Sequence, residues 1–478
     1  MLRKLLLPLS LLVIVAMLVG CAAQPTAAPA PAAPAAEAPT EAAPAAEAPT
    51  EAAPAAPAAT GNVKELNILW AQWDPANYLQ QLTEDYTAQT GIKVNIIQEP
   101  WGSFGNLFNT EMAAQGDAWD MVVGDSQWLG QGATNGYYVD LTDFLTSTGI
   151  KDTVTPATLT YYGEYPAGSG KYWGYPTEGD ADGWSYRKDL FEDPKEMEAF
   201  KAKYGYDLAV PETYAQLKDI AEFFTRADQG LYGVAIYSQK DYDAVTMGVE
   251  NTMFPWGGKW YGDGYQVMGV VNSPENVEAL QFYKDLYDCC QGPGLSNAFY
   301  SETNDAMLGG QVAMSMNYFA FFPALVNPGT NPNYADKMGF FANPQGPTGG
   351  TGAALGGQGL SVISFVSPER QQASLDFIKW FAQDDVQAKW AELGGYTCNS
   401  KVLQSDAFLT NQPYNPAFAK TMTFVNDFFN IPPYAQLLEV SQREFSKFVV
   451  EGQGTAQETM DTMAAEFDKI LKAEGFIQ

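Results

Sequence analysis

Aromatic and acidic side chains stand together at three points early in the chain, each directly after a short apolar run. A ring offers an apolar face to a ligand, and a carboxylate accepts hydrogen bonds from it, so such pairs suit the capture of a small polar molecule. The pairs are Trp73 with Asp74, Glu99 with Trp101, and Asp125 with Trp128.

Strands and helices must alternate to hold these pairs. The apolar pattern predicts strands at 66–70, 92–97 and 121–123, with a helix from Pro75 up to Gly91 and another at 104–114 between them. This order predicts a parallel sheet covered by helices, in which ligands bind beyond the carboxyl ends of the strands. The three loops would then form one site. Asp74 also has a local explanation, because it would cap the first helix ahead of Pro75.

A second acidic and aromatic stretch runs from Tyr172 to Trp184. It is interpreted either as a polar loop that touches a ligand or as a turn with solvated acids. Beyond it, a helix is predicted at 213–225 and a strand at 232–237. Two further helices are predicted after Ser273 and Ser367, because each serine is followed by Pro and Glu. The chain is therefore expected to remain α/β to near its C-terminus.

The amino-acid composition excludes or disfavours several classes of catalytic site, metal site and binding partner. The chain has no histidine, which excludes Ser-His-Asp and Cys-His catalysis and zinc sites that use histidine. Its 56 acidic against 26 basic residues give a net charge of −30, which disfavours nucleic acids and anionic lipid surfaces as partners. Cationic ligands remain open. No metal or cofactor is expected, and an enzyme could use only carboxylate, Tyr or Lys chemistry.

The first sixty residues indicate where the protein works. Arg3 and Lys4 precede an apolar run at 5–19, which is typical of a signal peptide at 1–20. The run ends at Cys21 in a sequence that resembles the lipobox of bacterial lipoproteins, which implies a diacylated cysteine as the first mature residue. Residues 21–60 contain Ala, Pro, Glu and Thr repeats and are predicted to be an extended spacer.

These features together resemble the family 1 extracellular solute-binding proteins of ABC importers, the carbohydrate-binding group of the maltose-binding-protein type. The resemblance extends over the whole chain and rests on the order and spacing of several stretches. Among them are LNILWAQWDPANYLQQLTEDYTAQTGIKVNI at 66–96, AWDMVVGDSQWLGQ at 118–131, KYWGYPTEGDADGWSYRKDLF at 171–191 and GQVAMSMNYFAFF at 310–322.

The resemblance implies a periplasmic-binding-protein-like fold of two α/β lobes, joined by crossing hinge segments around a ligand cleft. Matching the stretches by order assigns 63–176 and 318–366 to lobe one, and 178–316 and 368–478 to lobe two. The crossings would then lie near 176–178, 316–317 and 365–367. The chain is expected to be a monomer that captures a sugar and delivers it to a membrane permease with its ATPase subunits.

The same resemblance implies a set of ligand-binding residues, drawn from both lobes and the crossings. Gln358 lies in a glycine-rich turn that is either a ligand contact or a plain loop, and Trp256 is expected to supply a stacking face from lobe two. The full predicted set is Trp73, Asp74, Trp101, Asp125, Trp128, Glu178, Asp180, Asp182, Trp184, Trp256, Asn317, Tyr318 and Gln358.

Two alternatives to sugar capture remain. The first is a binding protein for a polyamine or another cation, because aromatic rings with carboxylates also attract cations. The second is a glycosidase that uses Asp180 and Asp182 as its carboxylate pair. A non-enzymatic binding protein, held outside the cell membrane by its lipid, is the main prediction. Export permits a disulfide, and Cys398 is expected to pair with Cys289 or Cys290.

Overall fold

The computed structural model describes residues 63–240 and 244–478. Its first strand, β1 (Glu65–Ala71), is apolar along nearly its whole length, and its side chains from Ile68 onward are buried. A strand that is covered on both faces has this composition. Strand β1 pairs in parallel with its neighbours on both sides, so the predicted parallel β-α-β-α-β arrangement is confirmed.

Sheet one has five strands, and the fourth of them runs antiparallel to its neighbours. In spatial order they are β2 (Lys93–Glu99), β1, β3 (Met121–Asp125), β10 (Gln358–Val362) and β4 (Tyr175–Glu178).

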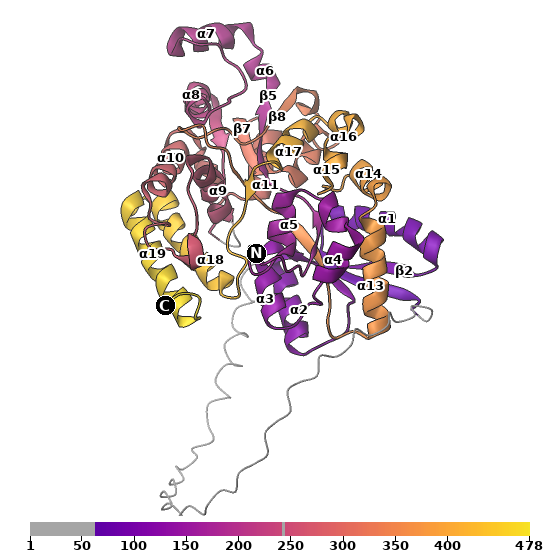
Figure 1. Ribbon diagram of the computed structural model, residues 1–478. Coiled ribbons are helices and arrows are strands. Elements are labelled where there is room, and N and C mark those ends of the chain that lie inside the picture. The colour runs from indigo at the N-terminus through magenta and orange to yellow at the C-terminus, as the bar shows by residue number, and fades with distance from the viewer. Residues whose placement is uncertain (1–62, 241–243) are drawn as a thin grey trace, which may run out of the picture. The chain divides into compact units, whose positions relative to one another are not determined.

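Sheet two has four strands of mixed direction, with β6 parallel to β7 and the other pairs antiparallel. In order they are β6 (Tyr232–Ala235), β7 (Val312–Tyr318), β5 (Asp182–Arg187) and β8 (Met338–Phe341). A separate short pair joins β9 (Ala353–Ala354) to β11 (Val425–Asn426). The two main sheets confirm the predicted α/β class with two lobes, one around each sheet (Figure 1).

Helices cover both sheets and connect their strands. The helices of eight or more residues are α1 (Asp74–Thr90), α2 (Trp101–Ala113), α5 (Pro156–Gly163), α7 (Pro194–Tyr204), α8 (Tyr214–Phe224), α9 (Ala244–Met253), α10 (Pro274–Cys290), α11 (Tyr300–Leu308), α13 (Pro368–Phe381), α14 (Asp384–Leu393), α18 (Tyr434–Phe445) and α19 (Ala456–Ala473). The shorter ones are α3 (Leu129–Thr134), α4 (Thr142–Thr148), α6 (Lys188–Phe191), α12 (Pro323–Val326), α15 (Ser400–Leu403), α16 (Asp406–Asn411) and α17 (Asn415–Thr421).

Most of the predicted helix starts are confirmed. Ser273 and Ser367 each accept a hydrogen bond from the backbone N–H three residues later, and Thr213 forms a capping box with Gln216. The predicted cap of α1 is wrong. Trp73, in an extended conformation, is its N-cap, and Asp74 is the first helical residue. Asp74 therefore faces the positive end of the helix dipole without closing the first turn.

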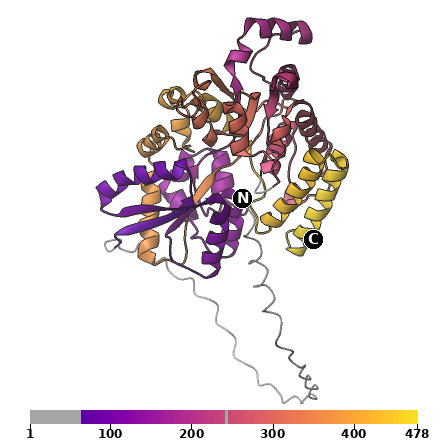
Figure 2. The ribbon, with the colours of Figure 1, turned by 180° about the vertical axis from the view of Figure 1, so that it is seen from behind.

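Two segments belong to a different sheet from the one predicted. Strand β8 pairs with β5 and so lies in sheet two, although 318–366 was assigned to lobe one. Helix α13 contacts β10 and β1 of sheet one, although 368–478 was assigned to lobe two. Figures 1 and 2 both show α13, in orange, among the indigo and purple elements of lobe one. The two later crossings are consequently misplaced, and the second lies between β8 and β10.

The predicted disulfide is also wrong. Cys289 and Cys290, at the end of α10, are bonded to each other with an S–S distance of 2.01 Å, and Cys398 is a buried free thiol. Cys398 lies instead against the crossing segment, where a Cβ placed on Gly179 would be 3.0 Å from its sulfur. Among the described residues, therefore, no disulfide joins distant segments.

The predicted signal peptide, the lipidated Cys21 and the spacer lie outside the described residues. Within 63–240 and 244–478, no helix combines the length and the apolar character needed to cross a membrane.

An ion pair between half-buried Arg370 and buried Asp120 joins α13 to sheet one and gives a test of this packing. The fully buried carboxylate of Asp120, before β3, accepts hydrogen bonds from Asn67 N–H at 2.7 Å and from Arg370 Nε at 2.6 Å. Arg370→Met would leave this buried charge without its cation, so we expect the free energy of unfolding to fall by about 2 kcal/mol in urea denaturation.

The exposed pair between Lys389 and Asp85 is the matched control. Lys389→Met should change the free energy of unfolding by about 0.5 kcal/mol or less, because water screens such pairs. Equal effects of the two substitutions would show that Arg370 does not hold α13 in place.

Candidate functional site

A cavity of ≈ 200 Å³ opens where the carboxyl ends of β1, β2 and β3 meet elements of lobe two. We call it the first cavity. Trp73 follows β1 by two residues, Trp101 follows β2 by two residues, and Asp125 ends β3. The residues that line it are Trp73, Trp101, Gly102, Asp125, Ser126, Gln127, Asp180, Phe299, Tyr300, Tyr318, Phe321, Leu355 and Gly356.

Lobe one contributes two indole rings. Trp73 and Trp101 meet edge to face with ring centroids 5.3 Å apart, and Trp73 meets Trp70 in the same way at 5.7 Å. Trp70 is fully buried, and its Nε1 donates to Gln358 Oε1. A rigid core residue therefore supports the ring that reaches the cavity.

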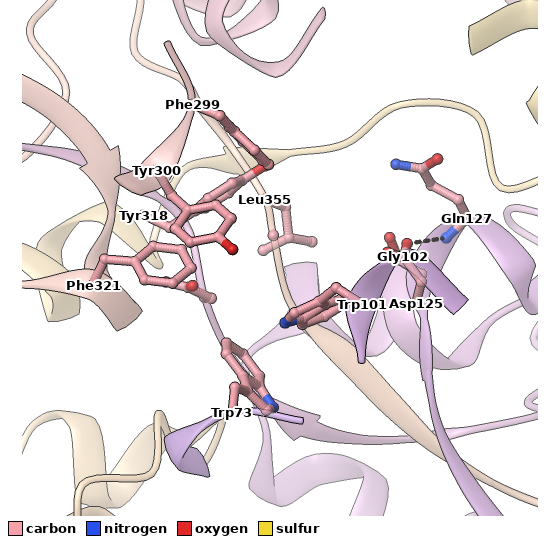
Figure 3. A pocket seen from close by; sticks show the side chains of 13 residues that line it. Trp73, Trp101, Gly102, Asp125, Gln127, Phe299, Tyr300, Tyr318, Phe321 and Leu355 are labelled. Atoms are coloured by element: carbon pink, nitrogen blue, oxygen red, sulfur yellow. Dashed lines mark hydrogen bonds between the residues drawn. The ribbon is translucent and has the colours of Figure 1, made fainter. Parts of the chain in front are cut away.

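Lobe two contributes four aromatic rings from around the carboxyl end of β7 and the start of α11. Tyr300 and Phe321 stack with centroids 4.3 Å apart and planes 11° from parallel, and Phe299 adjoins Tyr300 at 5.0 Å. Figure 3 shows this group facing Trp73 and Trp101 across the cavity. Two apolar walls, one from each lobe, thus enclose the space.

Two carboxylates supply its polar edge. Asp125 accepts a hydrogen bond from the Gln127 N–H at 3.1 Å, which holds it at the start of the 3-10 helix Ser126–Trp128. Asp180 is buried in the crossing between β4 and β5. Its Oδ1 accepts from the N–H groups of Ala181 at 2.8 Å and Ala320 at 3.2 Å.

Burial governs the protonation of Asp180. It raises the pKa of this carboxyl to about 8, because its backbone hydrogen bonds only partly offset the loss of water. Burial, with the charge of Asp180, raises the pKa of Glu178 well above its usual value. Burial also raises the pKa of Asp427 to about 7. Among the described residues that line the cavity, none is Lys or Arg, so Asp180 has no cation beside it there.

The structure brings five of the thirteen predicted site residues into this cavity. They are Trp73, Trp101, Asp125, Asp180 and Tyr318.

The other eight predicted residues do not line the first cavity. Asp74 is exposed at the start of α1, and Trp128 stacks on Phe108 at 5.3 Å. Glu178, Asp182 and Asn317 are buried. Trp184 donates from Nε1 to Asn343 Oδ1 at 3.0 Å, Trp256 packs on Tyr214 and Phe282, and Gln358 accepts from Trp70.

Several of these buried residues support the lining. Asn317 donates from Nδ2 to the Tyr300 carbonyl at 2.9 Å and to Asn304 Oδ1 at 3.0 Å, so it fixes the start of α11. Glu178 Oε2 accepts from the Tyr396 N–H at 3.3 Å, and its other oxygen is buried with no hydrogen-bond partner among the described residues.

Sequence reasoning missed Phe299, Tyr300 and Phe321, the lobe-two wall. The sequence signal for Phe321 was the aromatic run 318–322 at the end of a strand, a pattern like the one that marked the lobe-one loops. Phe299 and Tyr300 stand nearly twenty residues ahead of that run and reach the cavity only because α11 packs on β7.

Comparison with known proteins gives a family match and several structural relatives. Residues 81–417 match the family described as bacterial extracellular solute-binding protein. A probable ABC transporter-binding protein of Deinococcus radiodurans is 24% identical over 326 residues, which cover 67% of this chain and 72% of the relative.

Two solved structures share the fold. Maltose-bound MalE3 of T. maritima has a TM-score of 0.72 at 23% sequence identity, and the alignment covers 85% of this chain and 100% of the MalE3 chain. A solute-binding protein of an ABC transporter from Agrobacterium radiobacter K84, in complex with ribitol, has a TM-score of 0.71 at 22% sequence identity. The alignment covers 86% of this chain and 99% of the Agrobacterium chain. The predicted periplasmic-binding-protein-like fold is therefore confirmed.

The raised pKa of Asp180 gives a pH dependence of stability. The carboxyl has a pKa of about 8 in the folded protein and about 4 when unfolded, so the folded state binds more protons between these values. The free energy of unfolding should therefore fall as the pH rises from about 4 to about 8. Asp180→Asn keeps the acceptor oxygen but cannot ionise.

We expect Asp180→Asn to match the wild type near pH 4 and to exceed it by about 5 kcal/mol near pH 8 in ligand-free urea denaturation, since each pH unit between the two pKa values contributes about 1.4 kcal/mol. Asp263→Asn changes an exposed aspartate and should leave the pH profile unaltered. Parallel profiles for Asp180→Asn and the wild type would contradict the raised pKa.

Proposed function

This chain belongs to the family of bacterial extracellular solute-binding proteins, and from that premise we propose that it captures a sugar or polyol in the first cavity. The supporting observation is the cavity itself, in which aromatic walls from two lobes enclose a space edged by two carboxylates. Sugars and polyols combine apolar C–H faces with hydroxyl groups, so rings can cover the faces while carboxylates and backbone groups bind the hydroxyls.

The comparisons support this ligand class. The Agrobacterium relative is in complex with ribitol and the T. maritima relative with maltose, and both share this fold over most of the chain. A protonated Asp180 would add a hydrogen-bond donor to the cavity, which suits a neutral hydroxyl ligand better than a polyamine.

Because the first cavity is lined from both lobes, binding of a ligand there would be coupled to closure of the two lobes around it. Trp73 and Trp101 belong to lobe one, and Tyr300 and Phe321 belong to lobe two, so a ligand gains both apolar walls only when the lobes are together. A ligand that makes more contacts in the closed form shifts the population toward it. The closed form would then be the state that a permease recognises.

We also propose the cellular setting. The Deinococcus radiodurans relative is named as a probable ABC transporter-binding protein, which supports delivery of the ligand to a permease and its ATPase subunits. We propose that the chain acts as a monomer, performs no catalysis, and is held at the outer side of the cell membrane by lipid on Cys21.

The ligand class is tested by isothermal titration calorimetry with monosaccharides, disaccharides, polyols and spermidine. Trp101→Ala removes a ring from the cavity wall, so we expect any sugar or polyol that binds to lose about 2 kcal/mol, roughly thirtyfold in affinity. Trp101→Phe should recover part of this loss. Trp173→Ala, which removes another half-buried tryptophan outside the cavity, should bind as the wild type does.

Heat from spermidine with none from any sugar or polyol would replace the proposed ligand class by a cationic one. Unchanged binding in Trp101→Ala would move the site out of the first cavity.

Membrane anchoring is tested at the predicted lipidation site. Cys21→Ser removes the proposed acceptor for the acyl chains, so we expect loss of palmitate labelling and of the protein from the membrane fraction of a bacterial host. Cys398→Ser should keep both, because that thiol is buried in the folded body. Retention of the label in Cys21→Ser would show that the anchor lies elsewhere.

A further inference from the structure

A second cavity of ≈ 380 Å³ adjoins the first. The two share one wall, because Trp101, Gly102, Asp125 and Gln127 line both of them. The second cavity lies on the side of this wall away from the aromatic group of lobe two. Figure 3 shows Asp125 and Gln127 beyond Trp101 as seen from Tyr300 and Phe321. A ligand in the first cavity could therefore continue past Trp101 into the second.

Helix α18 forms the opposite wall of the second cavity. Tyr434, Leu438 and Gln442 recur every four residues along one face of this helix, and Ala435 and Glu439 flank them. The other face of α18 is buried against α9 and α19, which holds the helix in place. Because α2 and the loop after β3 belong to lobe one, the second cavity also lies between the lobes.

The second cavity is more polar than the first. Its lining includes the amide side chains of Asn106, Asn109 and Gln442, where the first cavity is walled by rings. The Oδ1 atom of Asn109 is buried and has no hydrogen-bond partner among the described residues. A buried acceptor without a partner is unfavourable unless a ligand or water supplies the missing donor.

The sizes of the cavities bear on the length of the ligand. Small-molecule pockets typically measure about 300 to 1,000 Å³, and the first cavity falls below this range on its own. The second cavity falls within it, and so do the two cavities joined across Trp101. Neither lining contains Lys or Arg among the described residues, so neither side offers a partner for an acidic sugar.

We propose that the ligand is an uncharged oligosaccharide of at least two units, with one unit in the first cavity and the next in the second. This inference rests on the proposed function of sugar capture. Trp101 and Asp125 lie at the junction, where they contact both units. The second unit is recognised by Gln442 of α18 on one side and by Asn109 of α2 on the other. The second cavity thereby sets the minimum ligand length.

The test compares matched series in the full-length protein by isothermal titration calorimetry. The probes are glucose with maltose and maltotriose, glucose with cellobiose and cellotriose, and xylose with xylobiose and xylotriose. In the series that binds, we expect the disaccharide to bind at least about tenfold more tightly than its monosaccharide, because it adds hydrogen bonds in the second cavity.

Ala435→Trp fills the second cavity without altering the first, since Ala435 is exposed on α18 and lines only the second cavity. It should abolish the tenfold gain and leave monosaccharide affinity unchanged. The matched control is Gln436→Trp, which places the same side chain at the next exposed position of α18, outside both cavities. It should bind the whole series as the wild type does.

Equal affinity for the monosaccharide and disaccharide, or a gain that survives Ala435→Trp, would overturn the two-unit inference and leave sugar capture standing. If no sugar or polyol binds the wild type, and Trp101→Ala does not alter the binding of any other probe, the proposal of sugar capture in the first cavity is wrong. The two failures thus give different results in the same titrations.

Discussion

Asp180 joins three segments of the chain at the point where the two sheets meet. Its carboxylate accepts from Ala181, in the crossing, and from Ala320, just after β7, while its carbonyl accepts from the Gly356 N–H at 3.1 Å. A carboxyl group in this position has to be buried, because the backbone groups it satisfies are themselves inside the protein. The same position makes Asp180 part of the cavity wall, so the joint between the lobes and the ligand site share one side chain.

Burial of this joint explains the unusual run of acids in the crossing. Glu178, Asp180 and Asp182 alternate along an extended segment, and all three are buried. From the sequence alone, such a run is interpreted either as ligand contacts or as solvated acids. The structure instead uses Glu178 to accept from Tyr396, which ties the crossing to the segment after α14. Of the three, only Asp180 lines the first cavity.

The sequence pattern predicted features that depend on neighbouring residues, and it could not predict features that depend on contacts between distant segments. Strand β1 and the Ser273 and Ser367 caps follow from nearby residues, and so do the positions of Trp73 and Trp101 after their strands. Trp128 does not line the first cavity, because its ring stacks on Phe108 after the 3-10 helix that follows β3, and it lines the second cavity instead. The sheet membership of β8 and α13 could not be predicted, because it depends on pairing between segments far apart in the chain.

The division of the aromatic wall between lobes has a physical consequence for selectivity. In the proposed open form each lobe would expose its aromatic wall to water. Closure would remove water from both walls together and place any charged group of the ligand in a low-dielectric space. With carboxylates at the edge and no basic side chain in the described lining, that space penalises an anion most strongly. The proposed closure would therefore strengthen discrimination by charge as well as by shape, because only a ligand compatible with the closed cavity would stabilise it.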